Sequence, residues 1–519
     1  MIQFTAVGSS KTMAQLVDKR VVVVGDIVTM NKNRDVLVGG RLCLEGRHIV
    51  ELVRADETLP TAFANAPVVE TGGTIYPGLF DLHNHLPYNM IPLWEVDRRF
   101  DNRREWQTVK EYYPAVTAPF TLLNQNRDKS YPRAIVRHAE CRGLFGGVTT
   151  GHGMPLKSGA MYSGLMRNIE QPLAPELPTV KSNTPDFNPE KLAEMLEWTK
   201  QGQPYIYHLS EGVGAYGERV FRDLQQVPGG LNPHLICIHC VGIPTDGWEA
   251  LRVVPGIVWS PTSNLLLYGE TCKIEEAKSR GIPIAIGADW APSGCKNLLG
   301  ELKVAREVSR YKGGVLTDAE LVAAVTIVPA AMVGWDKFLG SLEPGKWADL
   351  LVLAGTGGDH YARLVEAKET SVRAVVIDGR VRLGEDNGLV IADPLSSEPV
   401  SIGGKAYVLD LVEEGDDGLG GVTLAQALEK LRYGLEHLPG FEDGQKTLLL
   451  ANGVTDDNEL SLEDEMAQES MSSILLRGDN LPAQSMRLAP MAAVDDPDFL
   501  SAMRASVNMP DYAKKAFMD

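Results

Sequence analysis

Between residues 75 and 339, short apolar runs alternate with helical segments, and each run ends in a polar or small residue. The clearest runs are TIYPGLFDLHNH, GVTTGHG, PYIYHLS, HLICIHC, GIVWSP and IPIAIGAD. This alternation is typical of parallel βα units. We therefore predict an α/β fold whose main body, residues 76–339, is a (β/α)8 TIM barrel. In such a barrel the active site forms at the carboxyl edge of the strands, where these polar residues stand.

Two strand-rich regions flank this body, and a different region follows them. Residues 1–75 and 340–400 contain apolar runs broken by Gly, Asn and Asp, so we predict that they are the two halves of one split β-sandwich domain. Residues 401–519 hold about 22 acidic and about 9 basic residues and one helix candidate, TLAQALEKLRYGLEHL. We expect a helical or irregular acidic C-terminal extension, and the sequence leaves open whether it docks on the barrel, mediates assembly or is partly mobile.

The composition excludes several classes of protein. Of the 519 residues, 44% are hydrophobic and 23% are charged, as in a globular enzyme, and the six cysteines form no disulfide framework. A net charge of −18 argues against a nucleic-acid or anionic-membrane partner. No run is long and apolar enough to cross a bilayer, and the N-terminus lacks the pattern of a secretory signal. We expect a cytoplasmic protein with a small-molecule substrate. The sequence leaves open whether the chain forms a homo-oligomer.

Five polar residues close four of the predicted strands. His83 and His85 lie two apart, so the period-2 alternation of a strand directs both imidazoles to one face, the barrel interior. His208, His239 and Asp289 each end a separate strand. Any one of them could simply form hydrogen bonds at the rim, but together they indicate a catalytic rim. Imidazole is a natural ligand of zinc and iron, and a buried Asp289 without a cation would be costly.

The order of these motifs resembles that of the amidohydrolase superfamily. The segments are TIYPGLFDLHNHL, HLSEG, ICIHC, WSPTSN, AIGADWAPSG and GSLEPGKWADLLVL, and the likeness covers roughly residues 20–390. The HxxE after the fifth strand resembles the cytosine-deaminase and chlorotriazine-hydrolase branch, which generally uses one metal ion. The resemblance implies that the ion, Zn²⁺ or alternatively Fe²⁺, is bound by His83, His85, His208 and Asp289. It also implies three catalytic residues. Asp289 is one of them, Glu211 is the proton shuttle, and His239 orients the water or polarises the substrate.

The chemistry of these residue types supports the implied roles. A divalent ion bound by three imidazoles and a carboxylate lowers the pKa of a bound water enough to supply hydroxide near neutral pH. Attack on an sp² carbon leaves a nitrogen that needs a proton, and Glu211 lies three residues past a ligand. We therefore predict a hydrolase of a carbon–nitrogen bond in a non-peptide amide, a cyclic amide or an amino-substituted heterocycle.

The substrate pocket is less well defined by the sequence. Residues 87–134 are too long for a simple βα link and are rich in Trp, Tyr and Arg, so we interpret them as a lid or substrate wall. Six residues near the motif ends are candidates for the pocket lining: Tyr88, Trp94, His152, Asn264, Trp290 and Ser293.

Two alternatives compete with this prediction. Lys181 could be a carbamylated bridge between two metals, as in binuclear cyclic amidases and lactonases of other branches; metal content per chain separates the two. The barrel could also be a non-catalytic binding protein, since a fold alone does not specify function. No ligand that the resemblance implies is missing here, which favours an enzyme.

Overall fold

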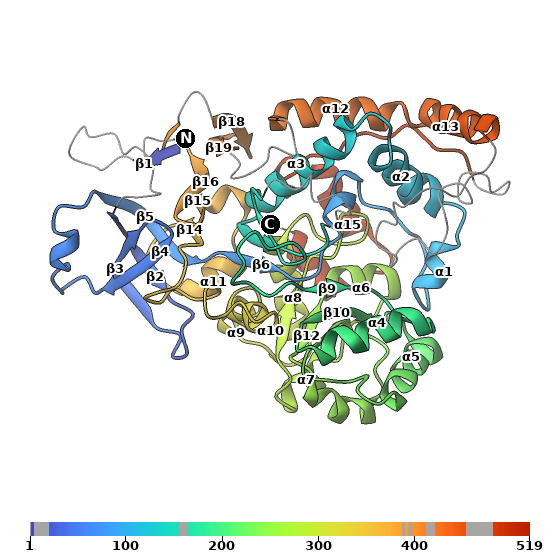
Figure 1. Cartoon of the computed structure of the whole chain (residues 1–519), viewed down its shortest axis with the longest axis horizontal. Coiled ribbons are helices and arrows are strands. Elements are labelled where there is room, and N and C mark those ends of the chain that lie inside the picture. The colour runs from blue at the N-terminus through green and yellow to red at the C-terminus, as the bar shows by residue number, and fades with distance from the viewer. Residues whose placement is uncertain are drawn as a thin grey trace.

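The computed structural model describes residues 2–4, 20–154, 164–386, 390–392, 397–411, 421–452 and 481–518. A large, mainly antiparallel sheet lies beside a body of short parallel strands and helices, and α12 (Leu424–Glu436) and α13 (Leu438–Asn452) run along the upper side (Figure 1). Residues 5–19, part of the stretch in which we expect no secretory signal, lie outside the described residues. In the described ranges, no helix has the length and apolar character needed to cross a membrane.

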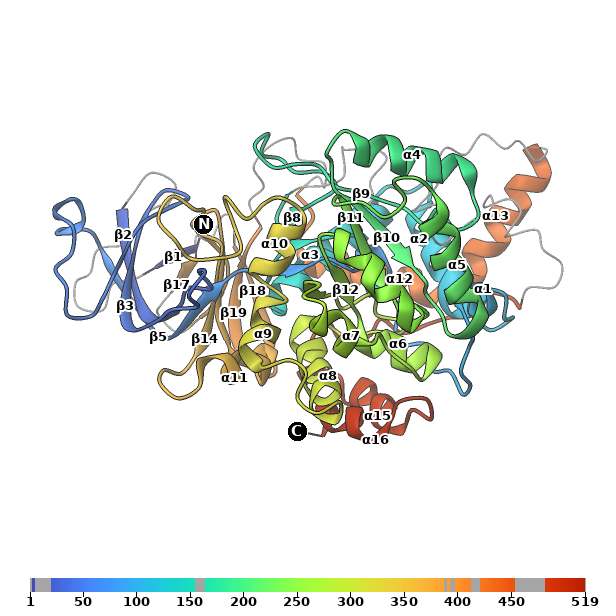
Figure 2. The ribbon, with the colours of Figure 1, turned by 90° about the horizontal axis from the view of Figure 1, so that it is seen from below.

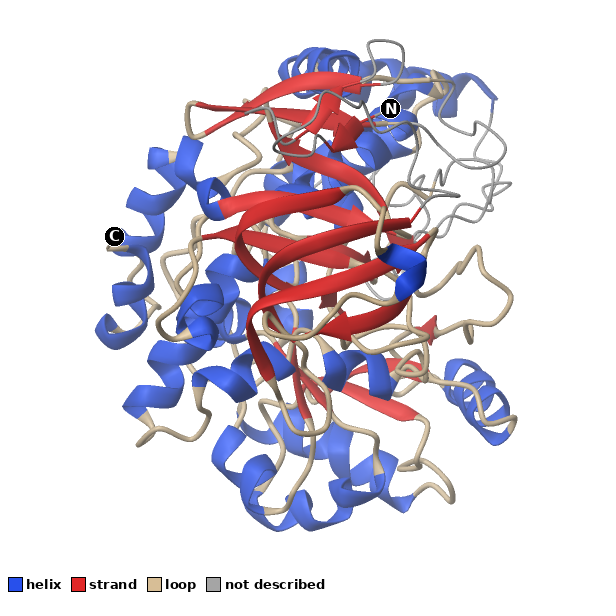
Figure 3. Ribbon diagram, turned by 90° about the vertical axis from the view of Figure 1, so that its left-hand side faces the viewer, coloured by secondary structure: helices blue, strands red, loops and turns tan. Residues whose placement is uncertain are grey.

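The large sheet contains nine strands, and Figure 3 shows its face. In spatial order they are β18 (Ser397–Ile402), β19 (Lys405–Asp410), β16 (Arg380–Glu385), β15 (Val372–Ile377), β14 (Leu350–Ala354), β5 (Val68–Pro77), β2 (Arg20–Val28), β3 (Val36–Glu45) and β4 (His48–Val53). The valine run of β2 is largely buried, as β-branched side chains in a covered sheet are. β5 pairs with β14, so the strand-rich regions at the two ends of the barrel segment share one sheet, which continues past residue 400 through β19. A separate short pair joins β1 (Ile2–Phe4) and β17 (Val390–Ala392).

Parallel strands build the other body. β6 (Leu79–Asp81), β7 (Val148–Gly151) and β8 (Arg167–Asn168) form one sheet, and β9 (Lys181–Ser182), β10 (Tyr205–Leu209), β11 (Leu235–His239), β12 (Ile257–Trp259) and β13 (Ile284–Ile286) form another. Backbone hydrogen bonds join both edges of the two sheets. The Val180 N–H donates to the Ile169 carbonyl at 3.0 Å, the Asp289 N–H to His83 at 2.7 Å, and the His85 N–H to Asp289 at 2.9 Å. The carboxyl ends of β6 and β13 are therefore side by side.

Helices alternate with these strands and cover them (Figure 2). They are α3 (Ser130–Phe145), α4 (Pro189–Lys200), α5 (Gly214–Gln226), η6 (Thr245–Val253), α6 (Pro261–Tyr268), α7 (Ile274–Ser279), α8 (Leu298–Tyr311), α9 (Asp318–Ala323) and α10 (Ile327–Met332). Outside this series are α11 (His360–Val365), between β14 and β15, and the short turns η2 (Thr61–Phe63) and η7 (Glu369–Ser371). Local sequence sets several of their starts. Asn188 and Asn297 cap α4 and α8, and Thr317 with Glu320 forms a capping box on α9.

The long segment after β6 contains η3 (Leu86–Met90), α1 (Arg103–Gln107), the π-helical turn η4 (Tyr113–Thr117) and α2 (Ala118–Asn124). The C-terminal region contributes α12 (Leu424–Glu436), α13 (Leu438–Asn452), η8 (Ala493–Asp495), α15 (Pro497–Ala505), α16 (Asp511–Lys514) and η9 (Lys515–Phe517). Its described parts dock on the body: the Arg137 guanidinium donates to the Val422 carbonyl at 2.8 Å, and Lys296 forms an ion pair with Asp496 at 2.6 Å.

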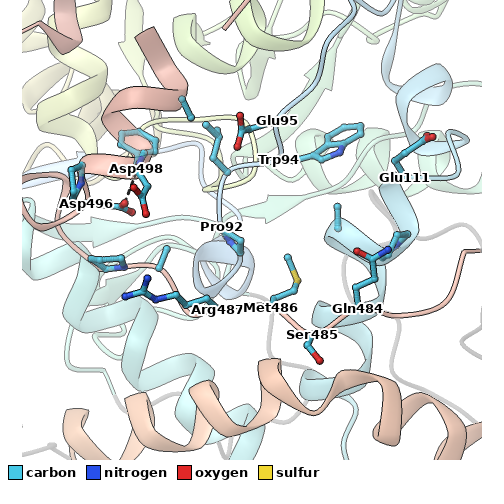
Figure 4. A pocket seen from close by; sticks show the side chains of 18 of the residues that line it. Pro92, Trp94, Glu95, Glu111, Gln484, Ser485, Met486, Arg487, Asp496 and Asp498 are labelled. Carbon is cyan, nitrogen blue, oxygen red and sulfur yellow. Dashed lines mark hydrogen bonds between the residues drawn. The ribbon is translucent and has the colours of Figure 1, made fainter. Parts of the chain in front are cut away.

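A cavity of about 820 Å³ separates the long segment from the C-terminal region. Figure 4 shows the side chains of Trp94 and Glu111 from the long segment and of Met486 and Arg487 from the C-terminal region around it. The long segment thus has one face toward this cavity.

The contact between β6 and β13 leaves no room for a side chain at Gly287. A Cβ there would lie 2.4 Å from the His83 Cβ and 2.7 Å from the His83 backbone nitrogen. We predict that Gly287→Ala lowers the free energy of unfolding by about 1–3 kcal/mol, measured by chemical denaturation. Gly444→Ala is the control, because a Cβ there meets nothing within 4 Å in α13 and alanine favours a helix. Equal stability of Gly287→Ala and the wild type would contradict this packing.

Candidate metal centre and active site

Three imidazole nitrogens and one carboxylate oxygen converge at the carboxyl ends of the parallel strands. The Nε2 atom of His83 lies 3.1 Å from Nε2 of His208 and 3.3 Å from Oδ1 of Asp289. The Nε2 atom of His85 lies 3.3 Å from Nε2 of His208 and 3.5 Å from the same Oδ1. Metal bonds of 2.0–2.1 Å in a tetrahedron place the ligand atoms about 3.3 Å apart. All four side chains are buried, and these four distances match that spacing. The ligand atoms of His83, His85 and Asp289 lie within 4.8 Å of one another, and so do those of His83, His208 and His239.

Three parallel strands, β6, β10 and β13, carry these side chains at their carboxyl ends. His83 and His85 follow β6, His208 lies in β10, and Asp289 follows β13. Asp289 has a backbone φ of 62°, and His239, the last residue of β11, has a φ of 64°. Non-glycine residues adopt this left-handed conformation at a cost, and such residues gather at functional sites.

Burial sets the protonation of the ligands. Burial and then the neighbouring His239 lower the pKa of His83 well below its usual value, and burial together with His85 does the same for His208. Both rings are therefore neutral near pH 7, with a lone pair free to bind a metal. Burial raises the pKa of Asp289 to about 7. A cation among these groups would stabilise the carboxylate that burial alone disfavours.

His83 is oriented by a hydroxyl that the sequence analysis did not single out. Its Nδ1 atom lies 2.6 Å from Oγ of Ser260, which follows β12. A hydrogen bond on Nδ1 holds the ring with Nε2 toward the other ligands, as such outer partners do in metal sites.

His239 lies beside His83 and His208, with ring centroids 4.6 and 5.4 Å away, and is held by Asn264. The Asn264 amide donates to Nδ1 of His239 at 2.9 Å, and the hydroxyl of Thr271 donates to the Asn264 carbonyl oxygen at 3.3 Å. Since Nδ1 accepts, the proton of the neutral ring is on Nε2. His239 therefore presents an N–H donor toward the centre.

Glu211 lies next to His239, with Oε2 at 3.7 Å from the His239 Nε2. Its Oε1 atom accepts a hydrogen bond of 2.8 Å from the Tyr268 hydroxyl, and that hydroxyl accepts one of 2.9 Å from the Trp106 indole. Burial raises the pKa of Glu211, which favours holding a proton. Sequence reasoning missed Tyr268 and Trp106, because an aromatic residue in an apolar helix or a long loop carries no local signal of such a contact.

Two of the pocket candidates lie against the histidines. The Trp290 ring centroid is 6.0 Å from that of His85, and the Tyr88 ring is 5.4 Å from Trp290 and 6.3 Å from His85. Ser293 supports this wall, because its hydroxyl accepts from the Trp290 indole and lies 2.8 Å from the Ser263 hydroxyl. The site thus has an aromatic side.

The remaining candidates are placed differently. His152 is buried after β7, with Nε2 at 3.9 Å from a Glu170 oxygen, and contributes to the low pKa of His83. Trp94 stacks on Phe100 and lines the cavity toward the C-terminal region rather than contacting the histidines.

Lys181 does not join the cluster. Its Nζ atom is 2.7 Å from a Glu194 oxygen and 4.4 Å from the centre of the Trp198 ring, and 39% of its side chain is exposed. Glu194 and Trp198 belong to the covering helix α4, so a bridging role for Lys181 finds no support in this geometry.

Comparison of the sequence with known proteins gives consistent relatives. The sequence model described as "Amidohydrolase family" matches residues 74–382. A 5-methylthioadenosine/S-adenosylhomocysteine deaminase of Syntrophobacter fumaroxidans is 30% identical over 210 residues, which are 36% of this chain and 47% of that protein. The guanine deaminase of Escherichia coli K12 is 27% identical over 137 residues, 26% of this chain and 31% of that protein. The chain thus spans less than half the length of these relatives.

Solved structures share the fold over a larger part of the chain. An adenosine deaminase from Xanthomonas campestris with bound zinc has a TM-score of 0.57 and 18% identity, covering 73% of this chain and 95% of that one. An atrazine chlorohydrolase from Arthrobacter aurescens TC1 complexed with zinc has a TM-score of 0.55 and 18% identity, covering 72% and 97%. At this identity the likeness concerns the fold alone.

We predict about one zinc or iron ion per chain in the purified protein, because four ligand atoms meet at one point. Elemental analysis by mass spectrometry should show that His208→Ala loses most of this metal, while Lys181→Ala retains it. Two ions per chain, with one lost in Lys181→Ala, would contradict the single site.

Proposed function

The chain belongs to the amidohydrolase family, and from this premise we propose that it is a metal-dependent hydrolase that cleaves a carbon–nitrogen bond in a small molecule. One observation carries the proposal. Four distances of 3.1–3.5 Å connect the buried ligand atoms of His83, His85, His208 and Asp289. Glu211 lies 3.7 Å from His239, whose ring centroid is 4.6 Å from that of His83.

The proposal includes the finer architecture. Residues 76–339 close as a (β/α)8 barrel, and residues 1–75 and 340–400 form the split β-sandwich domain, whose sheet extends through β19 (Lys405–Asp410). The remainder of residues 401–519 is an accessory extension. The backbone hydrogen bonds that join both edges of the two parallel sheets support closure of the barrel. The shared sheet of β5 and β14 supports the split domain.

His83, His85, His208 and Asp289 would hold one divalent ion, and zinc suits this set of three imidazoles and a carboxylate, with Fe²⁺ as the alternative. When bound, the ion supplies an activated water for attack on an sp² carbon. Asp289, buried and close to two of the imidazoles, contributes the negative charge of the site. Asn264 and Ser260 keep His239 and His83 in the orientations that this arrangement needs.

Glu211 and His239 divide the proton transfers. The carboxylate of Glu211 accepts a proton from the attacking water at Oε2 and returns it to the leaving nitrogen. The oxygen of the water stays on the carbon, the carbon–nitrogen bond breaks, and the amine leaves with the proton. The Nε2–H of His239 donates a hydrogen bond to the electronegative atom next to the reacting carbon, where negative charge develops.

The aromatic side of the site favours a planar substrate. Tyr88 and Trp290 lie beside His85, and rings of this kind stack on flat heterocycles. Together with the deaminase relatives, this favours an amino-substituted heterocycle.

A test uses the zinc-loaded protein with guanine, adenosine, S-adenosylhomocysteine, 5-methylthioadenosine, melamine and hydantoin. We expect ammonia release from at least one amino compound, with an oxygen replacing the amino group in the mass spectrum. Conversion of hydantoin alone would point to ring opening of cyclic amides, and no turnover of any compound by the metal-loaded protein would contradict the proposal.

Replacing Glu211 should separate catalysis from metal binding. Glu211→Gln keeps the size and shape of the side chain but cannot accept and return a proton. We predict that its metal content equals that of the wild type while turnover falls roughly 10²-fold or more. Steady-state kinetics and elemental analysis of the same preparation check this. Near-normal turnover would remove Glu211 from its role and leave His239 as the next candidate.

A further inference from the structure

A chain of hydrogen bonds connects the long segment after β6 to the proton-transfer group. The indole Nε1–H of Trp106, in α1, donates to the Tyr268 hydroxyl at 2.9 Å, and this hydroxyl donates to Oε1 of Glu211 at 2.8 Å. All three side chains are buried. The three residues come from the long segment, from the last position of α6 and from the loop after β10.

The chemistry of the groups fixes the direction of this chain. An indole N–H can only donate, so the Tyr268 oxygen accepts from Trp106 and its own hydrogen is left for Glu211. Hydrogen bonds to a carboxylate are among the stronger ones, and a buried carboxylate oxygen without a donor is costly. Tyr268 therefore holds Oε1, and Oε2 is the oxygen that faces His239.

The helix α1 is itself attached to the loop that carries Glu211. Asn102 caps the first turn of α1, and the Val213 N–H, two residues past Glu211, donates to the Asp101 carbonyl at 2.6 Å. Arg103, the first residue of α1, has its guanidinium 3.6 Å from the Asp186 carboxylate. The position of Trp106 is thus tied to the loop that carries the acid–base group.

We infer that Tyr268 is a positioning residue for Glu211 and that Trp106 in turn holds the Tyr268 hydroxyl in place. Proton transfer then depends on the docking of α1. This inference rests on the proposed function of Glu211. Its consequence is that α1 (Arg103–Gln107), through Trp106, helps to position the acid–base group. Trp106 also lies 5.8 Å from Trp290, ring to ring, so the same residue supports the aromatic side of the site.

The kinetic test is a double-mutant cycle on the panel compound that the wild type converts fastest. Tyr268→Phe keeps the ring and removes only the hydroxyl, and a misplaced catalytic group can cost 10–100-fold in rate. We expect turnover to fall at least about 10-fold with KM and metal content changed less than about 2-fold. In the Glu211→Gln background, Tyr268→Phe should cost less than about 2-fold, because Tyr268 acts only through the proton shuttle. Trp106→Phe should also lower turnover.

Matched controls exist in the same molecule. Tyr113→Phe also removes a buried tyrosine hydroxyl that donates to a glutamate, Glu442 of α13, at 2.8 Å. Trp335→Phe removes a buried indole that donates to the Pro178 carbonyl at 2.9 Å. Both should keep turnover within about 2-fold of the wild type. Equal losses from Tyr268→Phe in both backgrounds, or wild-type turnover in Tyr268→Phe, would overturn the inference.

A second measurement needs no substrate and so separates this inference from the proposed function. The chain has eight tryptophans, so an ¹H–¹⁵N spectrum of the full chain contains several indole N–H signals. The signal that disappears in Trp106→Phe is the signal of Trp106. We expect this signal to shift in Tyr268→Phe, because the indole loses its acceptor, and to stay in place in Tyr113→Phe. An unshifted signal in Tyr268→Phe would show that the hydrogen-bond chain does not exist, whatever the activity.

Discussion

The site depends on the backbone pairing between Asp289 and the pair His83 and His85. Two hydrogen bonds, from the Asp289 N–H to His83 and from the His85 N–H to Asp289, join the ends of strands that lie about 200 residues apart in the chain. This pairing places a carboxylate 3.3–3.5 Å from two imidazoles. It requires glycine at position 287, because His83 fills the space of any side chain there. The buried carboxylate and neutral imidazoles then form a site that a divalent cation stabilises.

Much of this centre could be predicted from the sequence because its signals are local. A histidine pair two apart after an apolar run, and a polar residue ending each later run, follow from the period of a strand and the geometry of parallel sheets. Tyr268 and Trp106 could not be found this way, since their contact depends on how the long segment packs over the strands. A bridging role for Lys181 is suggested only by the carbamylated lysine of other branches of the superfamily; in this chain β9 has two residues and Lys181 pairs with Glu194 on α4.

The parallel strands form a scaffold that other proteins share, whereas the loops after such strands vary from one protein to another. A similar fold can therefore carry different chemistry. The adenosine deaminase and the atrazine chlorohydrolase each resemble this chain in fold, and each is 18% identical to it. A shared fold does not specify a substrate. In this chain, residues 87–134 reach the acid–base group on one side and line the cavity facing the C-terminal region on the other. Choice of substrate is therefore expected to depend on this segment and on the aromatic side formed by Tyr88 and Trp290.

One ion is expected to bind where the ends of β6, β10 and β13 meet, and anomalous diffraction at the zinc absorption edge tests this most directly. Crystals of the zinc-loaded protein should show a single strong peak per chain, about 2.0–2.2 Å from Nε2 of His83, His85 and His208 and from Oδ1 of Asp289. A peak bound instead by His239 with Cys237 and Cys240, or two peaks of similar height at the ends of the parallel strands, would contradict a single site of four ligands.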